Sequence, residues 1–515
     1  MQASDIKILQ TPSEFYEVLK SKIRNAQERI FLSTLYIGRE EHELISTIQE
    51  ALRAQPNLKV SILADFLRGT RDAPKATCAG LLSSLEEEFG SERVEVRMYH
   101  TPNLGLYSKR IIPSRINEGW GLQHIKLYGV DDEIILSGAN LSNDYFTNRQ
   151  DRYHVFSSKA MTDYFAKFHK ALSTLSYVVH PYSFHIRKFQ EMLELQDAQQ
   201  QEQEREWERE EGEEQEDSEE DQAKRRKERE KKLHKVMETS EYDHSMDWPL
   251  TNKATSPLHD PEGYIVATTK RLAPLIRPPK KPLPPSPFAD TIVYPLAQLT
   301  PLLDPDTSTE HPGLLSLLTA LSSSSFSSSR WLFTAGYFNT HPTITRALLN
   351  TASAKGTVVT AAPEANGFYN SAGVSGLLPA AYTLLARRFL RRVDRARCRD
   401  QIELKEWRRG TVGEPGGWTY HAKGLWVTMP GEEQPSVTLV GSSNYTKRSY
   451  KLDLEMNALV VTKNADLKKR LADEQEWLQE HARTVTKKDL EGQERKVGWK
   501  VRAAMVIVSL LGGAL

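Results

Sequence analysis

The sequence predicts an α/β protein built from two similar half-domains. Short apolar stretches typical of strands alternate with amphipathic stretches of helical period, and the alternation recurs in both halves of the 515-residue chain. Helices placed between strands favour a mostly parallel sheet with both faces covered. Each half also carries one His-x-Lys sequence, His124/Lys126 and His421/Lys423, at a comparable place. We interpret this as an internal duplication.

The first half begins close to the N-terminus. A helix is expected after Thr11, because the Thr11 or Ser13 hydroxyl can cap it and the acidic Glu14 lies in its first turn. The remaining elements follow from apolar patterning and are strands at 29–38, 58–66 and 94–100 and helices at 41–53 and 78–89.

The second half repeats this plan. Its first strand, 330–339, begins with arginine and reaches Tyr337, as strand 29–38 begins with arginine and reaches Tyr36. A helix at 342–353 and a strand at 357–362 follow in the same order. Two unrelated domains would not predict that the His-x-Lys sequence arrives at nearly the same distance after each tyrosine.

Composition shifts predict the domain boundaries. The segment between the halves is almost entirely charged or amide residues, acidic first and then basic, and cannot bury a core. An inert solvated spacer is favoured over a binding tail. The expected organisation is a first half at 1–195, a charged insertion at 196–240, a Pro-rich connector at 241–290, a second half at 291–480 and a C-terminal extension with an apolar end at 481–515.

Charge and cysteine content exclude several classes of protein. The formal net charge is zero, which disfavours a nucleic-acid partner. The chain has only two cysteines, Cys78 and Cys398, which excludes a disulfide framework and a Cys-rich zinc site and fits a reducing compartment. No apolar run reaches the roughly 18 residues that span a bilayer. The apolar end at 503–515 either lies in a membrane interface or packs on the body, and the N-terminus shows no signal or transit pattern.

The two His-x-Lys sequences carry residue types suited to phosphoryl chemistry. Residues i and i+2 of a strand face the same side, so each histidine projects together with its lysine. A small-residue turn and an asparagine follow in each half, ending at Asn140 and Asn444. A histidine can attack phosphorus, while lysine and asparagine hold the phosphoryl oxygens and a second histidine moves the proton.

One such motif would be close to chance, but two at matching places in a repeat indicate function. A nearby carboxylate is expected to orient each imidazole. The scheme requires no metal or cofactor, although a divalent cation could assist a diphosphate substrate.

The sequences around these motifs resemble the phospholipase D superfamily, whose pattern is HxKxxxxD followed by GSxN in each half. The likeness is strongest to the eukaryotic phosphatidylglycerophosphate synthase family, through QHIKLYGVDDEIILSGANLSNDYFTNRQDRY, PEANGFYNSAGVSGLLPAAY and YHAKGLWV with LVGSSNYTKRSYKLDLEMNALV. It implies two phospholipase D-like α/β/α half-domains packed around one shared active site.

The resemblance also implies a reaction, partners and a location. The phosphatidyl group would pass from CDP-diacylglycerol to glycerol-3-phosphate through a phosphatidyl-histidine, with release of CMP, in a step leading to phosphatidylglycerol and cardiolipin. By analogy His124 is the nucleophile and His421 the acid/base, with the reverse assignment open. The implied location is the matrix face of the mitochondrial inner membrane, as a peripheral protein. The sequence does not specify an oligomeric state.

Other enzymes of the superfamily share these strands. A phospholipase D or a cardiolipin-synthase-like transferase would differ only in the acceptor, and a nuclease is disfavoured by the neutral charge. A lipid-binding scaffold without activity is disfavoured because both histidines and both lysines are present.

The two motifs are not identical, and this asymmetry suggests specialised halves. Asp131 completes the first motif, whereas Thr428 stands at the equivalent position of the second. We therefore expect Glu455 to supply the carboxylate for His421, and Asp131 and Asp151 to serve the His124 side.

Further polar residues near the motifs are expected to bind substrate. They are Asn140, Asn444, Ser442, Arg149, Arg152 and Arg448. For any single arginine the alternative is ordinary surface charge. A basic stretch at 386–399 with apolar residues on one side, together with Leu104–Tyr107, Trp120 and the apolar C-terminus, offers candidates for contact with an anionic membrane surface.

Overall fold

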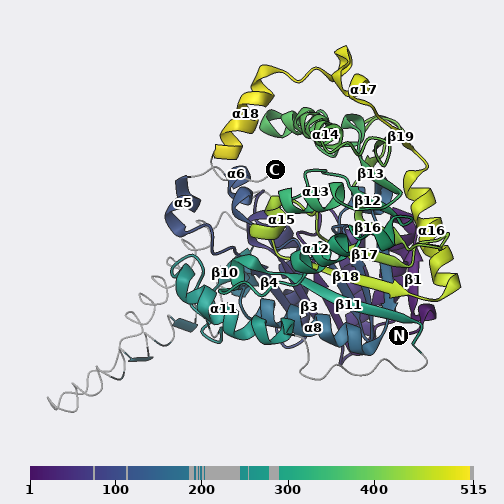
Figure 1. The fold of residues 1–515 in the computed structure, drawn as a ribbon. Coiled ribbons are helices and arrows are strands. Elements are labelled where there is room, and N and C mark those ends of the chain that lie inside the picture. The colour runs from purple at the N-terminus through teal and green to yellow at the C-terminus, as the bar shows by residue number, and fades with distance from the viewer. Residues whose placement is uncertain are drawn as a thin grey trace, which may run out of the picture.

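The computed structural model describes residues 1–72, 76–111, 114–184, 244–252, 254–277 and 289–510, with a few isolated positions between 191 and 202. Most of the predicted charged insertion at 196–240 and most of the Pro-rich stretch that follows Arg277 lie outside the described residues, as do residues 511–515 of the apolar end. In Figure 1 the second half, teal to yellow, lies in front of the purple-to-blue first half.

A nine-stranded sheet forms the centre of the first half. Across the sheet its strands are β1 (Ile6–Leu9), β8 (Tyr153–Ser157), β6 (Glu133–Ser137), β5 (Leu127–Val130), β2 (Arg29–Ser33), β3 (Lys59–Asp65), β4 (Val94–Tyr99), β9 (Tyr177–Pro181) and β10 (His244–Asp247).

An eight-stranded sheet forms the centre of the second half. Its strands are β11 (Thr291–Gln298), β18 (Glu455–Thr462), β17 (Val437–Gly441), β16 (Lys423–Thr428), β12 (Arg330–Ala335), β13 (Lys355–Ala361), β14 (Ile402–Trp407) and β19 (Ala482–Thr484). The order matches the first sheet strand for strand from β1 to β9. The predicted duplication is therefore confirmed as two copies of one topology.

The expectation of mostly parallel sheets is wrong. Parallel pairing within the two sheets, as far as they are described, is confined to β2–β3–β4 and β12–β13–β14. After each motif the chain turns straight back instead of crossing over through a helix, so β5 pairs antiparallel with β6 and β16 antiparallel with β17. A direct reversal of this kind can only place neighbouring strands antiparallel.

Helices cover the sheets, some on the outer faces and some between the two halves (Figure 1). In the first half they are α1 (Pro12–Arg24), α2 (His42–Ala54), α3 (Phe66–Gly69), α4 (Cys78–Phe89), α5 (Leu106–Ile111), α6 (Ser114–Asn117), α7 (Asn143–Thr147), α8 (Lys159–Ser173) and α11 (Pro261–Ile276). In the second half they are α12 (Glu310–Ala320), α13 (Pro342–Leu349), α14 (Leu378–Arg395), α15 (Lys447–Lys451), α16 (Ala465–Gln479), α17 (Lys487–Glu491) and α18 (Trp499–Leu510). Short 3-10 turns are η1 (Ala3–Asp5), η2 (Glu118–Trp120), η3 (Thr300–Leu302), η4 (Ser324–Phe326), η5 (Pro363–Ala365), η6 (Gly373–Leu377) and η7 (Gln493–Arg495).

The local signals read from the sequence explain where these helices begin. The Thr11 hydroxyl accepts a hydrogen bond from the Glu14 amide at 3.1 Å, and Pro12 occupies the first turn of α1. Helix α4 spans the predicted residues and is capped in the same way by Thr77. Capping of this kind satisfies backbone amides that the first turn leaves without partners.

The segment expected to be only a connector also contributes structure to the first half. Strand β10 pairs antiparallel with β9 at the edge of the first sheet. Helix α11, capped by Asp260, contacts α8. The first half therefore resumes after the insertion, which the polar and proline-rich composition around these elements hides.

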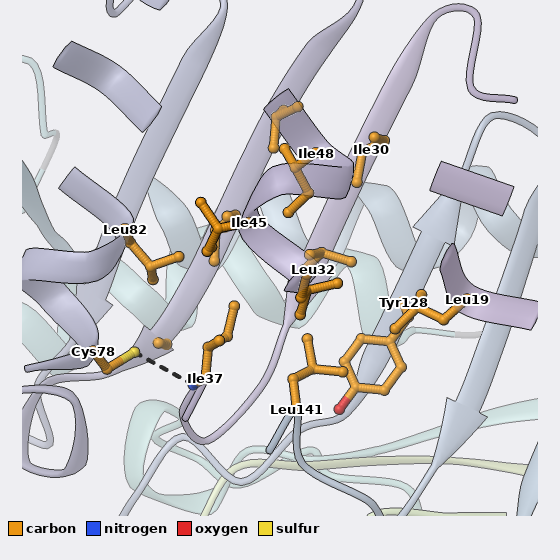
Figure 2. Packing of buried hydrophobic residues seen from close by; sticks show 14 of the residues in the cluster. Leu19, Ile30, Leu32, Ile37, Ile45, Ile48, Cys78, Leu82, Tyr128 and Leu141 are labelled. Atoms are coloured by element: carbon orange, nitrogen blue, oxygen red, sulfur yellow. Dashed lines mark hydrogen bonds between the residues drawn. The ribbon is translucent and has the colours of Figure 1, made fainter. Parts of the chain in front are cut away.

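A large apolar core fills the first half (Figure 2). Leu32 of β2, Ile45 and Ile48 of α2 and Tyr128 of β5 are all at most 5 % exposed. Cys78 lies in this core, where its Sγ accepts a hydrogen bond from the Ile37 amide at 3.3 Å and burial raises the pKa of its thiol to about 12. Cys78 is therefore a structural residue of this core.

A second core and a buried ionic network join the two halves. The apolar cluster draws side chains from both sheets, including Phe156 and Trp426. Arg152, from the first half, donates two hydrogen bonds of 2.9 Å to Glu474 of α16 and lies 3.8 Å from the Trp426 ring centroid. His154 contacts the same carboxylate at 2.8 Å. Such a buried network costs several kcal/mol if one partner is removed, so it fixes how the halves pack.

Candidate active site

The His421 motif reaches the first half through a short pair of parallel strands. β7 (Arg149–Gln150) pairs with β15 (Thr419–Tyr420), and the His421 amide donates to the Gln150 carbonyl at 2.8 Å. Asp151 follows β7 as His421 follows β15, so the two side chains emerge next to each other. The Asp151 carboxylate lies 2.6 Å from Nδ1 of His421.

The His124 motif makes the mirror contact with the second half. Gln123 bridges in parallel to Leu454, and the His124 amide donates to the Leu454 carbonyl at 3.0 Å. Glu455 comes next on that strand, and its two carboxylate oxygens lie 2.9 and 3.0 Å from Nδ1 of His124. Each histidine is therefore oriented through Nδ1 and keeps Nε2 for a reacting atom.

The halves thus exchange their carboxylates, and the expected pairing is wrong. Glu455 contacts His124 instead of His421, and Asp151 contacts His421 instead of His124. The strand segment before each histidine pairs across the interface between halves, so closeness in sequence does not predict the partner. The exchange also makes one composite site of the two motifs.

Asp131 lies outside this site. It occupies the two-residue turn between β5 and β6 with φ of 49°, and its carboxylate accepts hydrogen bonds from the backbone amides of residues 27–29 at 2.9 to 3.1 Å. Asp131 therefore does not have the expected catalytic role. It has a structural role instead, because it fixes the start of β2. This explains how Thr428 can stand at the equivalent position of the second half.

Both motif lysines are buried next to their histidines. Lys423 Nζ lies 2.8 Å from Nδ1 of His421 and 3.4 Å from the Asp151 carboxylate. Lys126 donates to the His124 carbonyl at 2.6 Å, and burial, opposed by Glu455, lowers its pKa to about 7. The two histidines and Lys126 lie in extended segments just before β5 and β16, not on the strands as expected, while Lys423 begins β16.

The pKa values of the two carboxyl groups are shifted in opposite directions. Burial raises the pKa of Glu455 to about 7, with Lys126 acting in the opposite direction. Burial alone would raise the pKa of Asp151, but Lys423 and His421 outweigh it and the net shift is downward. Burial, followed by the adjacent lysine, holds the pKa of both imidazoles well below the ordinary value. The His421 side therefore has the more strongly ionised orienting carboxylate.

Small residues of the turns after each motif make room for these groups. A Cβ at Gly138 would lie 2.5 Å from Lys423 Nζ and 2.6 Å from an Asp151 oxygen, so only glycine allows the close approach. Ser442, expected to bind substrate, is fully buried and donates to Glu455 at 2.5 Å. It therefore helps to orient the carboxylate of the His124 side.

A second buried carboxyl group supports the turn after the second motif. Asn457 donates to Glu310 at 2.7 Å and accepts from the Ser443 amide at 3.3 Å. Burial, together with the charge of Glu455, raises the pKa of Glu310 to about 8. Glu310 is therefore largely protonated at neutral pH.

Of the two asparagines predicted to bind substrate, Asn140 lies on the His421 side of the site. The Nδ2 group of Asn140 donates to the Tyr145 hydroxyl at 3.2 Å. The side-chain oxygens of Asn140 and Asn444 are buried without a hydrogen-bond partner among the described residues. Such atoms are left for a ligand or for water.

The three predicted arginines have different surroundings. Arg149 is mostly buried, donates to the Thr419 hydroxyl at 3.0 Å and pairs with Asp144 at 2.8 Å. Arg448 pairs with Asp453 at 2.8 Å and stays about a quarter exposed. Arg152, in contrast, is fully enclosed in the ionic network with Glu474, so its expected contact with substrate is replaced by a structural role.

Two tyrosines near His421 were not predicted as site residues. The Tyr145 hydroxyl lies 3.5 Å from Nε2 of His421, and Tyr337 packs edge-on against the imidazole with a centroid distance of 5.4 Å. One sequence feature pointed to Tyr337, which is its match to Tyr36 in the repeat. Tyr145 carried none.

Neither a metal site nor a membrane span is found in the parts of the chain that the structure describes. No group of three or more His, Cys, Asp or Glu side chains there is placed to hold a metal ion. No helix there is both long and apolar enough to cross a bilayer.

Full-length relatives share this sequence. The chain is 40% identical to CDP-diacylglycerol–glycerol-3-phosphate 3-phosphatidyltransferase of Saccharomyces cerevisiae, over 100% of this chain and 89% of the relative. It is 37% identical to the enzyme of that name from Schizosaccharomyces pombe, over 95% and 92% of the two chains. It is 34% identical to the mitochondrial enzyme of Homo sapiens, over 96% and 81%. No protein-family model matches the chain.

A solved structure shares the fold. Phosphatidylserine synthase of Haemophilus influenzae superposes with a TM-score of 0.64 over 99% of this chain and 94% of that one, at 19% identity. The likeness covers both halves and agrees with the expected pair of phospholipase D-like half-domains.

Proposed function

Because the chain belongs to the CDP-diacylglycerol–glycerol-3-phosphate 3-phosphatidyltransferase family, we propose that it moves a phosphatidyl group from CDP-diacylglycerol to glycerol-3-phosphate. The products are phosphatidylglycerophosphate and CMP. The observation that carries this proposal is the pair of histidines from opposite halves, each oriented through Nδ1 by a carboxylate of the other half. Two such groups suit a double displacement, in which one histidine holds the transferred group and the other moves the proton.

In the first step Nε2 of His124 attacks the phosphorus of the phosphatidyl group. The new N–P bond forms as the bond to the CMP oxygen breaks. His421, protonated when the negative charge of the bound diphosphate offsets burial and Lys423, supplies a proton to the leaving CMP. Lys126 and Lys423 stabilise negative charge on the phosphoryl oxygens. The Glu455 contact supports this role for His124 because it keeps the Nδ1 proton in place and leaves the Nε2 lone pair free.

In the second step His421 accepts the proton of the glycerol-3-phosphate hydroxyl. The alkoxide oxygen attacks phosphorus, the N–P bond breaks and His124 is restored. Asp151 supports this role because its pKa is shifted downward, and an ionised carboxylate stabilises the imidazolium that forms. Burial and Lys423 oppose that stabilisation in the resting protein, and the negative charge of the bound glycerol-3-phosphate would offset them in part.

The nucleophile can be identified by trapping. Enzyme mixed with CDP-diacylglycerol labelled in the phosphatidyl phosphate is quenched and digested, and the labelled peptide is sequenced. We expect the label on the peptide that contains His124 in the wild type, and none in His124→Ala. Label on His421 would reverse the assignment of roles, and full transfer activity in either alanine variant would overturn the two-histidine mechanism.

The enzyme is also proposed to act peripherally at the matrix face of the mitochondrial inner membrane. The mitochondrial names of the vertebrate relatives support the organelle. Exposed apolar side chains at Tyr107, Ile111 and Trp499 are candidates for membrane contact, whereas Leu104 is buried and the first turns of α18 pack on α14. Fractionation of mitochondria followed by carbonate extraction tests this: release of the protein by carbonate supports peripheral attachment, and retention contradicts it.

The proposed chemistry uses only side chains of this protein. A divalent cation would act by neutralising the diphosphate of the substrate instead of completing a protein site. Turnover measured across a magnesium titration, with EDTA as the starting point, tests this. Saturable activation that shifts with the CDP-diacylglycerol concentration would support a substrate-bound cation.

A further inference from the structure

Three arginines converge on one short turn just before the His124 motif. Glu118, in η2, accepts from Arg71 at 3.1 Å and from Arg68 at 3.3 and 3.5 Å. Arg448 of the second half donates to the Glu118 backbone carbonyl at 2.6 Å. None of these guanidinium groups belongs to the mechanism proposed above.

Two acidic side chains tie this group to His124. Asp65 accepts from the Arg68 amide and from the Gln123 amide, both at 2.9 Å. Asp453, the partner of Arg448, accepts from the Leu122 amide at 2.9 Å. The backbone of Arg68 and the side chain of Arg448 are therefore linked through these carboxylates to the two residues that precede the histidine.

The contact between Glu118 and Arg68 is loose for a largely enclosed ion pair. Its two N–O distances lie near the upper limit for a hydrogen bond, whereas Arg152 and Glu474 form two bonds of 2.9 Å. Arg68 and Arg71 are also about a fifth exposed, so solvent-borne anions can reach them. One carboxylate shared by two guanidinium groups leaves donors for a further anion.

Charge in this region favours an anionic ligand. In its described part three guanidinium groups face the carboxylates of Glu118 and Asp453, and the half-exposed Asp72 carboxylate lies 3.9 Å from Nε of Arg71. Burial raises the pKa of the third carboxyl group, that of Asp65, to about 8, so it adds little negative charge at neutral pH. Because solvent screens the half-exposed Asp72, the enclosed part of the group keeps an excess of positive charge.

The matching place in the second half has the opposite arrangement. β3 is followed by a segment with Arg68 and Arg71, whereas the matching strand β13 is followed by Ala362, Pro363 and Glu364. Glu364 contacts Arg408 at 3.2 Å and Arg495 at 3.9 Å, so in that half the repeated segment carries the carboxylate and not the arginines. The arginine pair after β3 is therefore not a repeated feature of the fold.

We propose that Arg68 and Arg71 form a phosphate-binding site for a substrate, and that the Glu118 carboxylate occupies this site until the phosphate displaces it. The ligand group is a phosphate mono- or diester, and the inference rests on the proposed function. Two proposed substrates carry such groups, the phosphomonoester of glycerol-3-phosphate and the diphosphate of CDP-diacylglycerol. Arginine pairs suit both because the guanidinium fork matches two phosphoryl oxygens.

The test measures KM for each substrate at saturating concentration of the other, in Arg71→Gln and Glu118→Gln. Arg71→Gln is expected to raise one KM tenfold or more with a kcat within threefold of wild type. Glu118→Gln is expected to lower the same KM, because the internal competitor loses its charge. A rise confined to glycerol-3-phosphate identifies the acceptor phosphate, and a rise confined to CDP-diacylglycerol identifies the diphosphate.

The Arg53 and Glu88 pair provides the matched control. It joins α2 to α4 on the surface of the same half, and Arg53→Gln should leave both KM values unchanged. Arg71→Lys, which keeps the charge, should recover at least part of the lost affinity, and circular dichroism confirms that each variant is folded. Unchanged KM values in folded Arg71→Gln, or a higher KM in Glu118→Gln, would overturn the phosphate site. Failure of the proposed function would show separately, as wild-type enzyme that releases no CMP with both substrates present.

Discussion

Replacement of Asp151 by asparagine tests the exchange of carboxylates between the halves. Asp151 Oδ2 lies 2.6 Å from Nδ1 of His421, and its other oxygen accepts from the Arg152 amide at 2.8 Å. The amide of asparagine can keep the backbone contact while losing the negative charge. The variant should be less stable, because buried Lys423 loses its charged partner, but it should still fold and fail in the step that His421 performs.

The size of the effect follows from what is lost. A charge-assisted hydrogen bond contributes about 1.5–3 kcal/mol, which corresponds to roughly a 10- to 150-fold loss of rate. Loss of the correct imidazole tautomer can enlarge this to about 10⁴-fold, as in serine protease triads. We expect kcat to fall by roughly 10²- to 10⁴-fold, with KM values changed little.

The affected step distinguishes the two sides of the site. The leaving CMP is a phosphate whose second pKa is near 6, so it needs little acid assistance. The glycerol hydroxyl is a far weaker acid and needs a base. Asp151→Asn should therefore accumulate the phosphatidyl-enzyme, whereas Glu455→Gln should slow its formation, because Glu455 orients His124.

Rapid-quench measurement of CMP release and of labelled enzyme checks this. A burst of CMP with persistent label is expected for Asp151→Asn, and slow release without label for Glu455→Gln. The reverse pattern would mean that each carboxylate serves the histidine of its own half, contrary to the geometry. Activity of Asp151→Asn within tenfold of wild type would refute its role in orienting His421.

Three further predictions follow from buried groups. Gly138→Ala should lower kcat, measured as CMP release, by about tenfold or more. The new Cβ would displace the Lys423 ammonium or the Asp151 carboxylate, and small displacements of catalytic groups slow the reaction. An unchanged kcat would contradict the close contact. Glu474→Gln should lower the free energy of unfolding in urea by about 3–5 kcal/mol, because it leaves Arg152 buried without its charged partner. The control Glu88→Gln, in an exposed pair, should cost about 1 kcal/mol or less. Equal effects of the two changes would refute the special role of the buried pair. Glu310, whose pKa is raised to about 8 from an ordinary 4.5, stays protonated in the fold while the unfolded chain ionises, so stability should fall as pH rises between these values. Glu310→Gln should therefore gain stability relative to wild type between pH 5 and pH 9 in thermal unfolding, and a constant difference would contradict the raised pKa.

Much of the fold was predictable from local patterns. Helix α4 spans the predicted residues, and α1 begins at Thr11, one of its two predicted caps, because capping and apolar period depend on neighbouring residues. The duplication was predictable from repeated strands and motifs. The antiparallel pairing of β5 with β6 was not predictable, because in the sequence the tight turn around Asp131 looks like any polar loop.

The candidate site shows the same division. His124, His421 and their lysines follow from motif and spacing, and the structure brings all four to one place. The roles of Asp131 and Arg152 did not follow, because a carboxylate or guanidinium beside a motif in sequence can point into a turn or an interface.

The sequence alone determined the residue types, the repeat and the two histidines. Only the tertiary structure decided which carboxylate serves which histidine, since the partners are 331 and 270 residues apart. The physical reason is that strand pairing across an interface depends on the packing of two complete half-domains. Local patterns encode each half, but the pairing of Gln123 with Leu454 and of β7 with β15 exists only once the halves meet.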